Sequence, residues 1–251
     1  MPETKATHRG FSRRALLGGA LAVPAAAALG VATPTAAHAY SWGRTLRQDM
    51  SGDDVRELQI RVAGWAADSP AQAYVGIDGS FGPQTLAAVR RFQSGWGLGV
   101  DGVAGPETFE QLNWLEGSGN STRHFNYSEF HSKDGSGFSG GQVGAGTVQT
   151  NVRLLMWKLE ALRRKLGNNP ITVNSGFRSV SHNSAVGGSS NSMHMYGIGA
   201  DVGVANRTPT QVYTSMKTCG FSGVILYSGH SHGDSRIQYA YGAQSWYWSN
   251  G

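Results

Sequence analysis

The chain has 251 residues, enough for one small module and one catalytic domain. Its formal net charge is +5, but residues 1–39 hold four basic residues against one acidic residue, so the other 212 residues (251 less 39) carry only +2. So small an excess gives no reason to expect nucleic-acid binding. Cys219 is the single cysteine, which excludes an intramolecular disulfide and favours a buried apolar role for this side chain.

Residues 1–39 have the pattern of an export signal. Residues 12–17 (Ser-Arg-Arg-Ala-Leu-Leu) resemble a twin-arginine signal, and an alanine-rich apolar run covers residues 15–31. Residues 37–39 (Ala-His-Ala) supply the small side chains that a signal peptidase reads. The run is rich in alanine and glycine and is interrupted by proline, so it would make a poor permanent membrane anchor. We expect cleavage before Tyr40, export and association with the cell wall.

Residues 40–115 contain an internal repeat. Residues 77–85 (IDGSFGPQT) return 23 residues later as residues 100–108 (VDGVAGPET). In each copy Asp-Gly predicts a tight turn, and Gly-Pro predicts the start of a helix with proline near its first position. Apolar side chains at helical spacing predict helices over residues 53–63 and 83–94. We expect a module of three short helices around a small core.

The repeat resembles the peptidoglycan-binding module that is joined to many cell-wall hydrolases, whose signature is D-G-x-x-G-P-x-T. The resemblance implies peptidoglycan as a partner. The alternative is that the repeat is only structural, because Asp-Gly turns recur in many small helical folds. Trp65, Tyr74 and Trp96 are candidates for stacking on sugar, although each is expected to belong to the core. Residues 116–122 follow as a polar linker whose composition predicts flexibility.

Residues 123–251 alternate between helical and strand patterns, which predicts a mixed α+β domain with helices on one side of a small, largely antiparallel sheet. A glycine-rich surface loop is expected over residues 135–146. The expected helices cover residues 147–166 and 209–219. The expected strands cover residues 171–175, 199–204, 224–227 and 237–241.

The residues with the clearest chemistry are His194 and Asp201, seven positions apart with Gly197 and Gly199 between them. This spacing differs from the i, i+4 pair of helical zinc peptidases, and the glycines disfavour a helix. We therefore expect His194 at the end of a loop and Asp201 on a strand. A second pair, His230-Ser231-His232, follows about thirty residues later. Two histidines and one aspartate suit a catalytic zinc with one position open for water. The alternative is a packed loop histidine, a solvated aspartate and a solvated histidine pair.

Several segments together resemble the zinc D-Ala-D-Ala carboxypeptidases of actinomycetes, within the D-alanyl-D-alanine metallopeptidase family typified by S-x-H-x-x-G-x-A-x-D and a later H-x-H. The matching segments are residues 174–179 (NSGFRS), 187–192 (GGSSNS), 194–197 (HMYG) and 200–201 (AD). Gly199 departs from the family pattern, which usually has alanine there. The segment before the histidine pair is also shorter than in the relatives and lacks an acidic residue and a histidine found there.

The resemblance implies one zinc ion per chain, held by His194, Asp201 and His232. His230 is then a nearby histidine that assists proton transfer or stabilises the tetrahedral intermediate. On a strand, residues i and i+2 face the same side, so both imidazoles are expected to point into one cleft.

Two further polar residues have implied or open roles. In the family, the arginine of S-G-[FY]-R-S, here Arg178, is associated with the C-terminal carboxylate of the substrate, and a guanidinium suits that carboxylate. Its alternative is a surface arginine. Asp234 either holds an imidazole in place or is a surface charge.

The sequence therefore predicts a secreted, monomeric zinc peptidase that hydrolyses the terminal D-alanyl-D-alanine bond of peptidoglycan stem peptides. One alternative is an endopeptidase of the same fold that cuts cross-bridges, and another is a non-catalytic wall-binding protein. A serine enzyme is disfavoured, because no G-x-S-x-G or S-x-x-K motif stands in a fitting context.

Overall fold

The structure is a computed structural model that describes residues 40–241 and 248–249. All of these belong to one compact unit spanning residues 36–251. The expected export signal, residues 1–39, lies outside the described residues. In the described part of the chain, no helix has the length and apolar character needed to cross a membrane.

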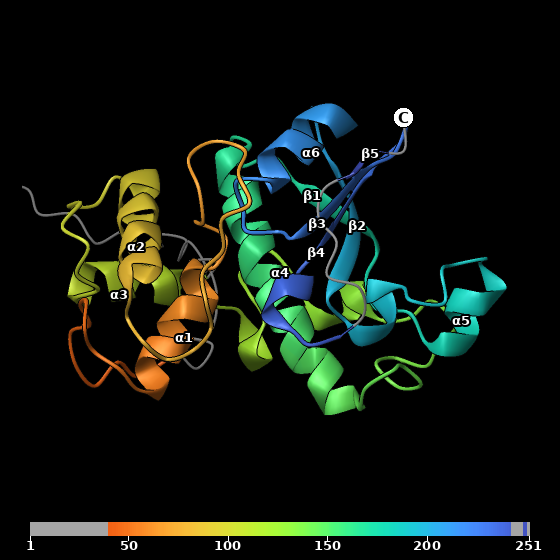
Figure 1. The fold of residues 1–251 in the computed structure, drawn as a ribbon, viewed down its shortest axis with the longest axis horizontal. Helices are drawn as coiled ribbons and strands as arrows, with labels where there is room; N and C mark the ends of the chain where they lie inside the picture. Colours follow the sequence, from red (N-terminus) through yellow and green to blue (C-terminus); the bar gives the residue numbers. More distant parts are fainter. Residues whose placement is uncertain (1–39, 242–247, 250–251) are drawn as a thin grey trace, which may run out of the picture. The chain divides into compact units, whose positions relative to one another are not determined.

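Three helices form the N-terminal module, as predicted: α1 (Asp53–Val62), α2 (Pro83–Trp96) and α3 (Pro106–Trp114) (Figure 1). Helices α2 and α3 each begin with proline after an extended glycine, because proline lacks the N–H that the first helical position leaves unbonded. Helix α2 ends at Gly97, whose φ of 73° is the left-handed conformation that glycine adopts without strain.

The repeat has a clear structural purpose, because a buried glutamine fastens each Asp-Gly turn. Gln59 Nε2 donates to Asp78 Oδ1 (2.7 Å), to the Ser80 carbonyl (3.0 Å) and to Thr85 Oγ1 (3.2 Å), and its Oε1 accepts from the Gly79 N–H (2.8 Å). In the second copy Gln93 makes the same four contacts, with Asp101, Val103, Thr108 and Gly102. The aspartate and threonine of the signature therefore stabilise the turns of the module itself.

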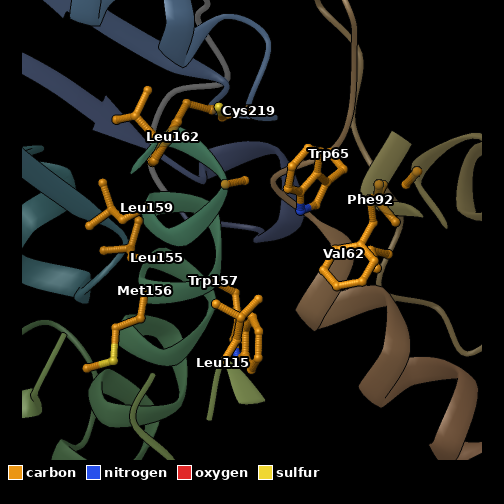
Figure 2. Close-up of a cluster of buried hydrophobic side chains, with 14 of the residues drawn as sticks. Val62, Trp65, Phe92, Leu115, Leu155, Met156, Trp157, Leu159, Leu162 and Cys219 are labelled. Carbon is orange, nitrogen blue, oxygen red and sulfur yellow. The ribbon is translucent and has the colours of Figure 1, made fainter. Parts of the chain in front are cut away.

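The C-terminal domain is built on α4 (Ala145–Lys165). The predicted helix covered residues 147–166, so the observed helix starts two residues earlier and ends one residue earlier than predicted. Figure 2 shows Leu155 and Leu159 on one side of this helix and Trp157 on the other. All three side chains are buried and belong to one apolar cluster that also includes residues of α1 and α2. Helix α4 thus supplies core to both parts of the chain.

A five-stranded sheet carries the rest of the domain (Figure 1). Its strands are β1 (Ile171–Ser175), β2 (Gly199–Val204), β3 (Gly223–Leu226), β4 (Ser231–Asp234) and β5 (Trp248–Ser249). The order is β1-β2-β4-β3-β5, and every neighbouring pair is antiparallel except β3 and β5. The prediction of a largely antiparallel sheet is confirmed.

The remaining elements are short helices and 3₁₀ turns. They are η1 (Ser118–Asn120), η2 (Tyr127–Phe130), α5 (Val180–Ala185), η3 (Met193–Tyr196), α6 (Pro209–Met216) and η4 (Arg236–Gln238). The predicted strand over residues 237–241 is wrong. Asp234 Oδ1 accepts from both the backbone N–H (3.2 Å) and the Nε (2.8 Å) of Arg236, which turns the chain directly after β4.

The N-terminal module is fastened along α4 by polar and close apolar contacts. Arg153 pairs with Glu57 of α1, and Arg164 Nε donates to the Gly95 carbonyl at the end of α2 (2.9 Å). A Cβ on Gly64 would lie 2.5 Å from the Cβ of Ala161, so glycine is needed where the chain after α1 meets α4.

The linker makes buried contacts that its composition does not predict. Glu116 is 9% exposed and pairs with the buried Arg61, and the Gly117 N–H donates to the Ser121 carbonyl (3.0 Å). Glu116 also forms an isolated β-bridge with Thr122. Glycine and serine permit flexibility, but the buried ion pair holds this segment in place.

Candidate metal centre

The sheet register places Asp201 directly opposite His232, on strands β2 and β4. His232 Nδ1 lies 2.8 Å from Asp201 Oδ1, although the residues are 31 positions apart. Gly199, two residues before Asp201, leaves room for the imidazole, because a Cβ there would lie 3.0 Å from His232 Cε1. The departure from the alanine of the family therefore has a steric explanation in this chain.

The sequence predicted His194 at the end of a loop, but His194 lies in the 3₁₀ turn η3. Its Nδ1 is 2.6 Å from the Gly176 carbonyl, which can only accept, so Nδ1 carries the hydrogen and Nε2 has the free lone pair. His194 Nε2 lies 3.3 Å from Asp201 Oδ1. The backbone at Gly176 approaches closely, since a Cβ there would meet Phe130 Cα at 2.5 Å.

The three predicted ligands come together as a buried group. One ligand atom from each of His194, Asp201 and His232 lies within 4.8 Å of the others, and the three residues are 4–7% exposed. Two ligands at about 2.0 Å from a zinc ion in tetrahedral geometry lie about 3.3 Å apart. The distances of 2.8 and 3.3 Å are close to that value, and two imidazoles with one carboxylate suit zinc. These residues fit the metal that the sequence predicts.

The electrostatics of the group favour a cation. Burial works against ionisation of Asp201, but the neighbouring imidazoles of His194 and His232 outweigh it and hold the pKa of this carboxyl below its usual range. Burial lowers the pKa of His194. Burial also acts against a charge on His232, yet Asp201 and Asp234 raise the pKa of its imidazole to about 9. A metal ion competes with a proton for such a nitrogen, because ligation requires the neutral ring.

Asp234 is buried behind the metal group, so it is not a surface charge. Its Oδ2 lies 3.2 Å from His232 Nε2, the nitrogen that faces away from Asp201. Arg236 grips the same carboxylate, with Nε donating to Oδ1 (2.8 Å) and NH2 donating to Oδ2 (2.5 Å). A carboxylate in this position orients a ligating histidine. Sequence reasoning missed Arg236, for which the sequence carries no signal beyond its nearness to Asp234.

Comparison with known proteins identifies the family. Residues 123–234 match the model of the peptidase M15 family, and residues 51–112 match the model of a peptidoglycan binding domain. The chain is 42% identical over 228 residues to the zinc D-Ala-D-Ala carboxypeptidase of Streptomyces albus G, covering 86% of this chain and 88% of that protein. The chain belongs to the peptidase M15 family.

Other relatives of this M15 peptidase match over shorter stretches. An uncharacterised protein of Kitasatospora aureofaciens is 43% identical over 76 residues, covering 30% of this chain and 59% of that protein. A spore cortex-lytic enzyme of Halalkalibacterium halodurans is 40% identical over 83 residues, covering 31% of this chain and 22% of that enzyme. These matches are too short to transfer the activity of either protein.

Arg178 of the M15 peptidase is bound to the metal group and is not a free surface arginine. Its NH2 donates to Asp201 Oδ2 (2.7 Å), and its Nε donates to Ser175 Oγ (2.9 Å). Ser175 stands opposite Asp201 in the register of β1 and β2, just after a β-bulge. Arg178 therefore holds the second carboxylate oxygen of Asp201 and leaves Oδ1 facing the two histidines.

His230 lies just before β4, so the prediction that both histidines of the pair stand on one strand is wrong. Its Nε2 is 3.9 Å from Asp201 Oδ1, which places it beside the ligand group without joining it. Its ring stacks on Tyr227, with centroids 4.6 Å apart and planes 19° apart. Tyr227 is a site residue that sequence reasoning missed.

A cleft of about 400 Å³ opens onto the metal group. One wall is formed by five residues of the 187–192 segment, which the sequence analysis matched to the family by resemblance. Arg178, Tyr227 and Arg236 contribute polar side chains to the other walls. Among the described residues that line the cleft, Asp201 is the sole carboxylate.

Proposed function

We propose that this protein is a secreted, zinc-dependent carboxypeptidase that hydrolyses the terminal D-alanyl-D-alanine bond of peptidoglycan stem peptides. The observation that carries the proposal is the buried group of His194, Asp201 and His232 at the base of a cleft that also contains a guanidinium. The identity over most of the chain to a zinc D-Ala-D-Ala carboxypeptidase supports the same bond as the target.

In this proposal His194 Nε2, Asp201 Oδ1 and His232 Nδ1 hold one zinc ion. When bound, zinc supplies Lewis-acid chemistry, polarising the carbonyl of the scissile bond and making water acidic enough to attack near neutral pH. The Gly176 carbonyl fixes the tautomer of His194, and Asp234 fixes that of His232.

His230 is the candidate proton carrier. Asp201 is the sole carboxylate among the described residues that line the cleft, and it is itself a proposed metal ligand. The described lining therefore contains no other carboxylate that could act as a general base. His230 is partly exposed and its Nε2 lies 3.9 Å from Asp201 Oδ1, which suits transfer of a proton to the leaving amine. Burial and the charge of Asp201 raise the pKa of Tyr227, so its phenol keeps a proton to donate into the cleft.

Arg178 is proposed to receive the C-terminal carboxylate of the substrate. Its hydrogen bonds to Ser175 and Asp201 use two of the five N–H donors of a guanidinium, and its side chain lines the cleft. The remaining donors suit a carboxylate, which only an exopeptidase substrate presents at this position. An endopeptidase would cleave a peptide whose C-terminus is blocked.

We further propose the domain limits and location that the sequence predicts. The signal peptide covers residues 1–39, the wall-binding module 40–115, the linker 116–122 and the peptidase domain 123–251. The mature protein acts as a monomer in the cell wall after twin-arginine export.

The test is release of free D-Ala from a pentapeptide stem that ends in D-Ala-D-Ala. We expect mature protein with zinc to release D-Ala, and we expect a chelator or His194→Ala to abolish release. His182→Ala is the matched control, because His182 lies on α5 outside the metal group. Metal binding with no D-Ala release, but with cleavage of a blocked or cross-linked peptide, would identify an endopeptidase. Binding to the wall without cleavage of any stem peptide would identify a wall-binding protein.

A further inference from the structure

The N-terminal module needs a surface for peptidoglycan, and the repeat does not supply it. The side chains of Asp78 and Thr85, and those of Asp101 and Thr108 in the second copy, are engaged by the buried glutamines. Residues that are committed to internal hydrogen bonds are poorly placed to bind a second molecule. The binding surface must therefore be sought among exposed side chains.

Trp114, the last residue of α3, is the one aromatic side chain that the module exposes among its described residues. It is 44% exposed, whereas Trp65 is 5% exposed and packs on Phe92 in the core (Figure 2). The sequence-based candidates Trp65, Tyr74 and Trp96 are thus all more covered than Trp114. Tryptophan is enriched at binding surfaces, because its large ring offers an apolar face together with a polar N–H.

The indole of Trp114 is held in place by neighbours from both parts of the chain. The guanidinium of Arg123 lies 4.0 Å from its ring centroid, and Arg123 NH1 donates to the Trp114 carbonyl (3.4 Å). The Trp96 ring meets it edge to face at 5.7 Å, and Arg164 of α4 lies 4.5 Å from the Trp96 ring. The result is a row of two indoles and two guanidinium groups, of which Trp114 and Arg123 are exposed.

We propose that Trp114 and Arg123 form a binding site for the glycan strand of peptidoglycan. Sugar rings present an apolar C–H face, which packs on an exposed indole. Peptidoglycan also carries carboxylates on its stem peptides and acetamido oxygens on its sugars, and a guanidinium donates to both. A ring that is already ordered by Arg123 and Trp96 loses little further freedom on binding.

This inference rests on the proposed wall binding and adds its location. The charge of the site matches the partner, because Arg123 and Arg164 are basic and the stem peptides end in carboxylates. The row also joins the module to the start of the peptidase domain, since Trp114 ends α3 while Arg123 follows the linker. A glycan strand held there lies at the junction of the module and the peptidase domain.

The experiment measures sedimentation of mature protein with purified peptidoglycan sacculi, together with D-Ala release from the soluble pentapeptide. We expect Trp114→Ala to weaken sacculus binding by about tenfold or more, the change that corresponds to about 1.4 kcal/mol. Trp114→Tyr should retain most of the binding. Arg123→Glu should weaken it and reduce its dependence on salt. The matched control is Val100→Ala, which removes another exposed apolar side chain of the module.

The outcomes separate this site from the proposed function. Loss of sacculus binding in Trp114→Ala and Arg123→Glu, with thermal unfolding and soluble D-Ala release unchanged, supports the site. Wild-type binding by both variants overturns it and leaves the peptidase proposal intact. If wild-type protein releases D-Ala but does not bind sacculi, both the site and the wall-binding role of the module are wrong.

Discussion

Replacing Asp234 by asparagine tests how the metal group is built. The carboxylate lies 3.2 Å from His232 Nε2 and is fully buried, with Arg236 holding both of its oxygens. Loss of such an orienting carboxylate typically lowers metal affinity or activity by about 10–100-fold. That range corresponds to about 1.4–2.7 kcal/mol of metal binding free energy. We therefore expect Asp234→Asn to raise the zinc dissociation constant by one to two orders of magnitude.

The same substitution also weakens a buried ion pair, so stability must be measured separately. Removing one partner of a buried pair costs about 3–5 kcal/mol. Glu160→Gln is the matched control, because Glu160 is a buried carboxylate that pairs with His124 Nδ1 at 2.8 Å, outside the metal group. It should lower the melting temperature of the metal-free protein without changing the zinc dissociation constant.

Zinc affinity is measured by competition with a chelator, and melting temperature with and without zinc. If folded Asp234→Asn binds zinc as tightly as the wild type, then Asp234 does not orient the ligand and the reasoning fails. Gly223→Ala gives an independent check, because its Cβ would lie 2.2 Å from Asp234 Oδ2 and displace the carboxylate. Gly203→Ala on β2 is its control, since the nearest atom to that Cβ is 3.8 Å away. Only the first glycine substitution should weaken zinc binding.

Three further predictions concern other parts of the molecule. His230→Ala should lower the rate of D-Ala release by about 10²–10⁴-fold, with the zinc dissociation constant unchanged in chelator competition. Burial lowers the pKa of the Lys158 ammonium group from 10.5 to about 7. Between pH 7 and pH 10.5 the unfolded chain therefore holds a proton that the folded protein has released. The free energy of unfolding rises with pH over this range. Lys158→Met should remove this rise when denaturant unfolding is compared at pH 7 and pH 9. Cleavage before Tyr40 turns its amide, 2.8 Å from Glu116 Oε2, into an ammonium group. Glu116→Gln should therefore destabilise the cleaved chain by about 1 kcal/mol more than a chain that is extended before Tyr40. Denaturant unfolding of the four proteins measures this difference as a double-mutant cycle.

Features that depend on neighbouring residues were predictable from the sequence. Strands β1 and β2 have the predicted bounds, and α2 begins at the proline that Gly-Pro marks. The apolar spacing of α4 predicted its extent to within two residues at either end. Each of these signals arises within a few residues of the element that it predicts, because helix starts and apolar periodicity are local properties.

Features that depend on long-range packing were not predictable. The linker is rich in glycine and serine, and its ion pair between Glu116 and Arg61 joins residues 55 positions apart. The strand expected after β4 is replaced by a turn because Arg236 folds back onto Asp234. For Asp234 the sequence left a surface charge and an orienting carboxylate equally open, since its burial depends on how the strands pair.

The candidate ligands were predictable as residues, but their geometry was not. A motif names His194, Asp201 and His232, yet only the sheet register brings Asp201 opposite His232. Shifting that register by one residue would turn one of the two side chains to the other face of the sheet. The register is therefore as much a part of the metal centre as the ligands themselves.

The short connection between β3 and β4 positions His230, the proton carrier that we propose. Strand β3 ends at Leu226 and β4 begins at Ser231, so only residues 227–230 connect them. The Tyr227 N–H donates to the His230 carbonyl (3.1 Å), which closes a tight turn. Stacking on Tyr227 then fixes the His230 ring beside the metal group. In the mechanism that we propose, proton transfer and transition-state stabilisation fall to this imidazole and to the phenol of Tyr227.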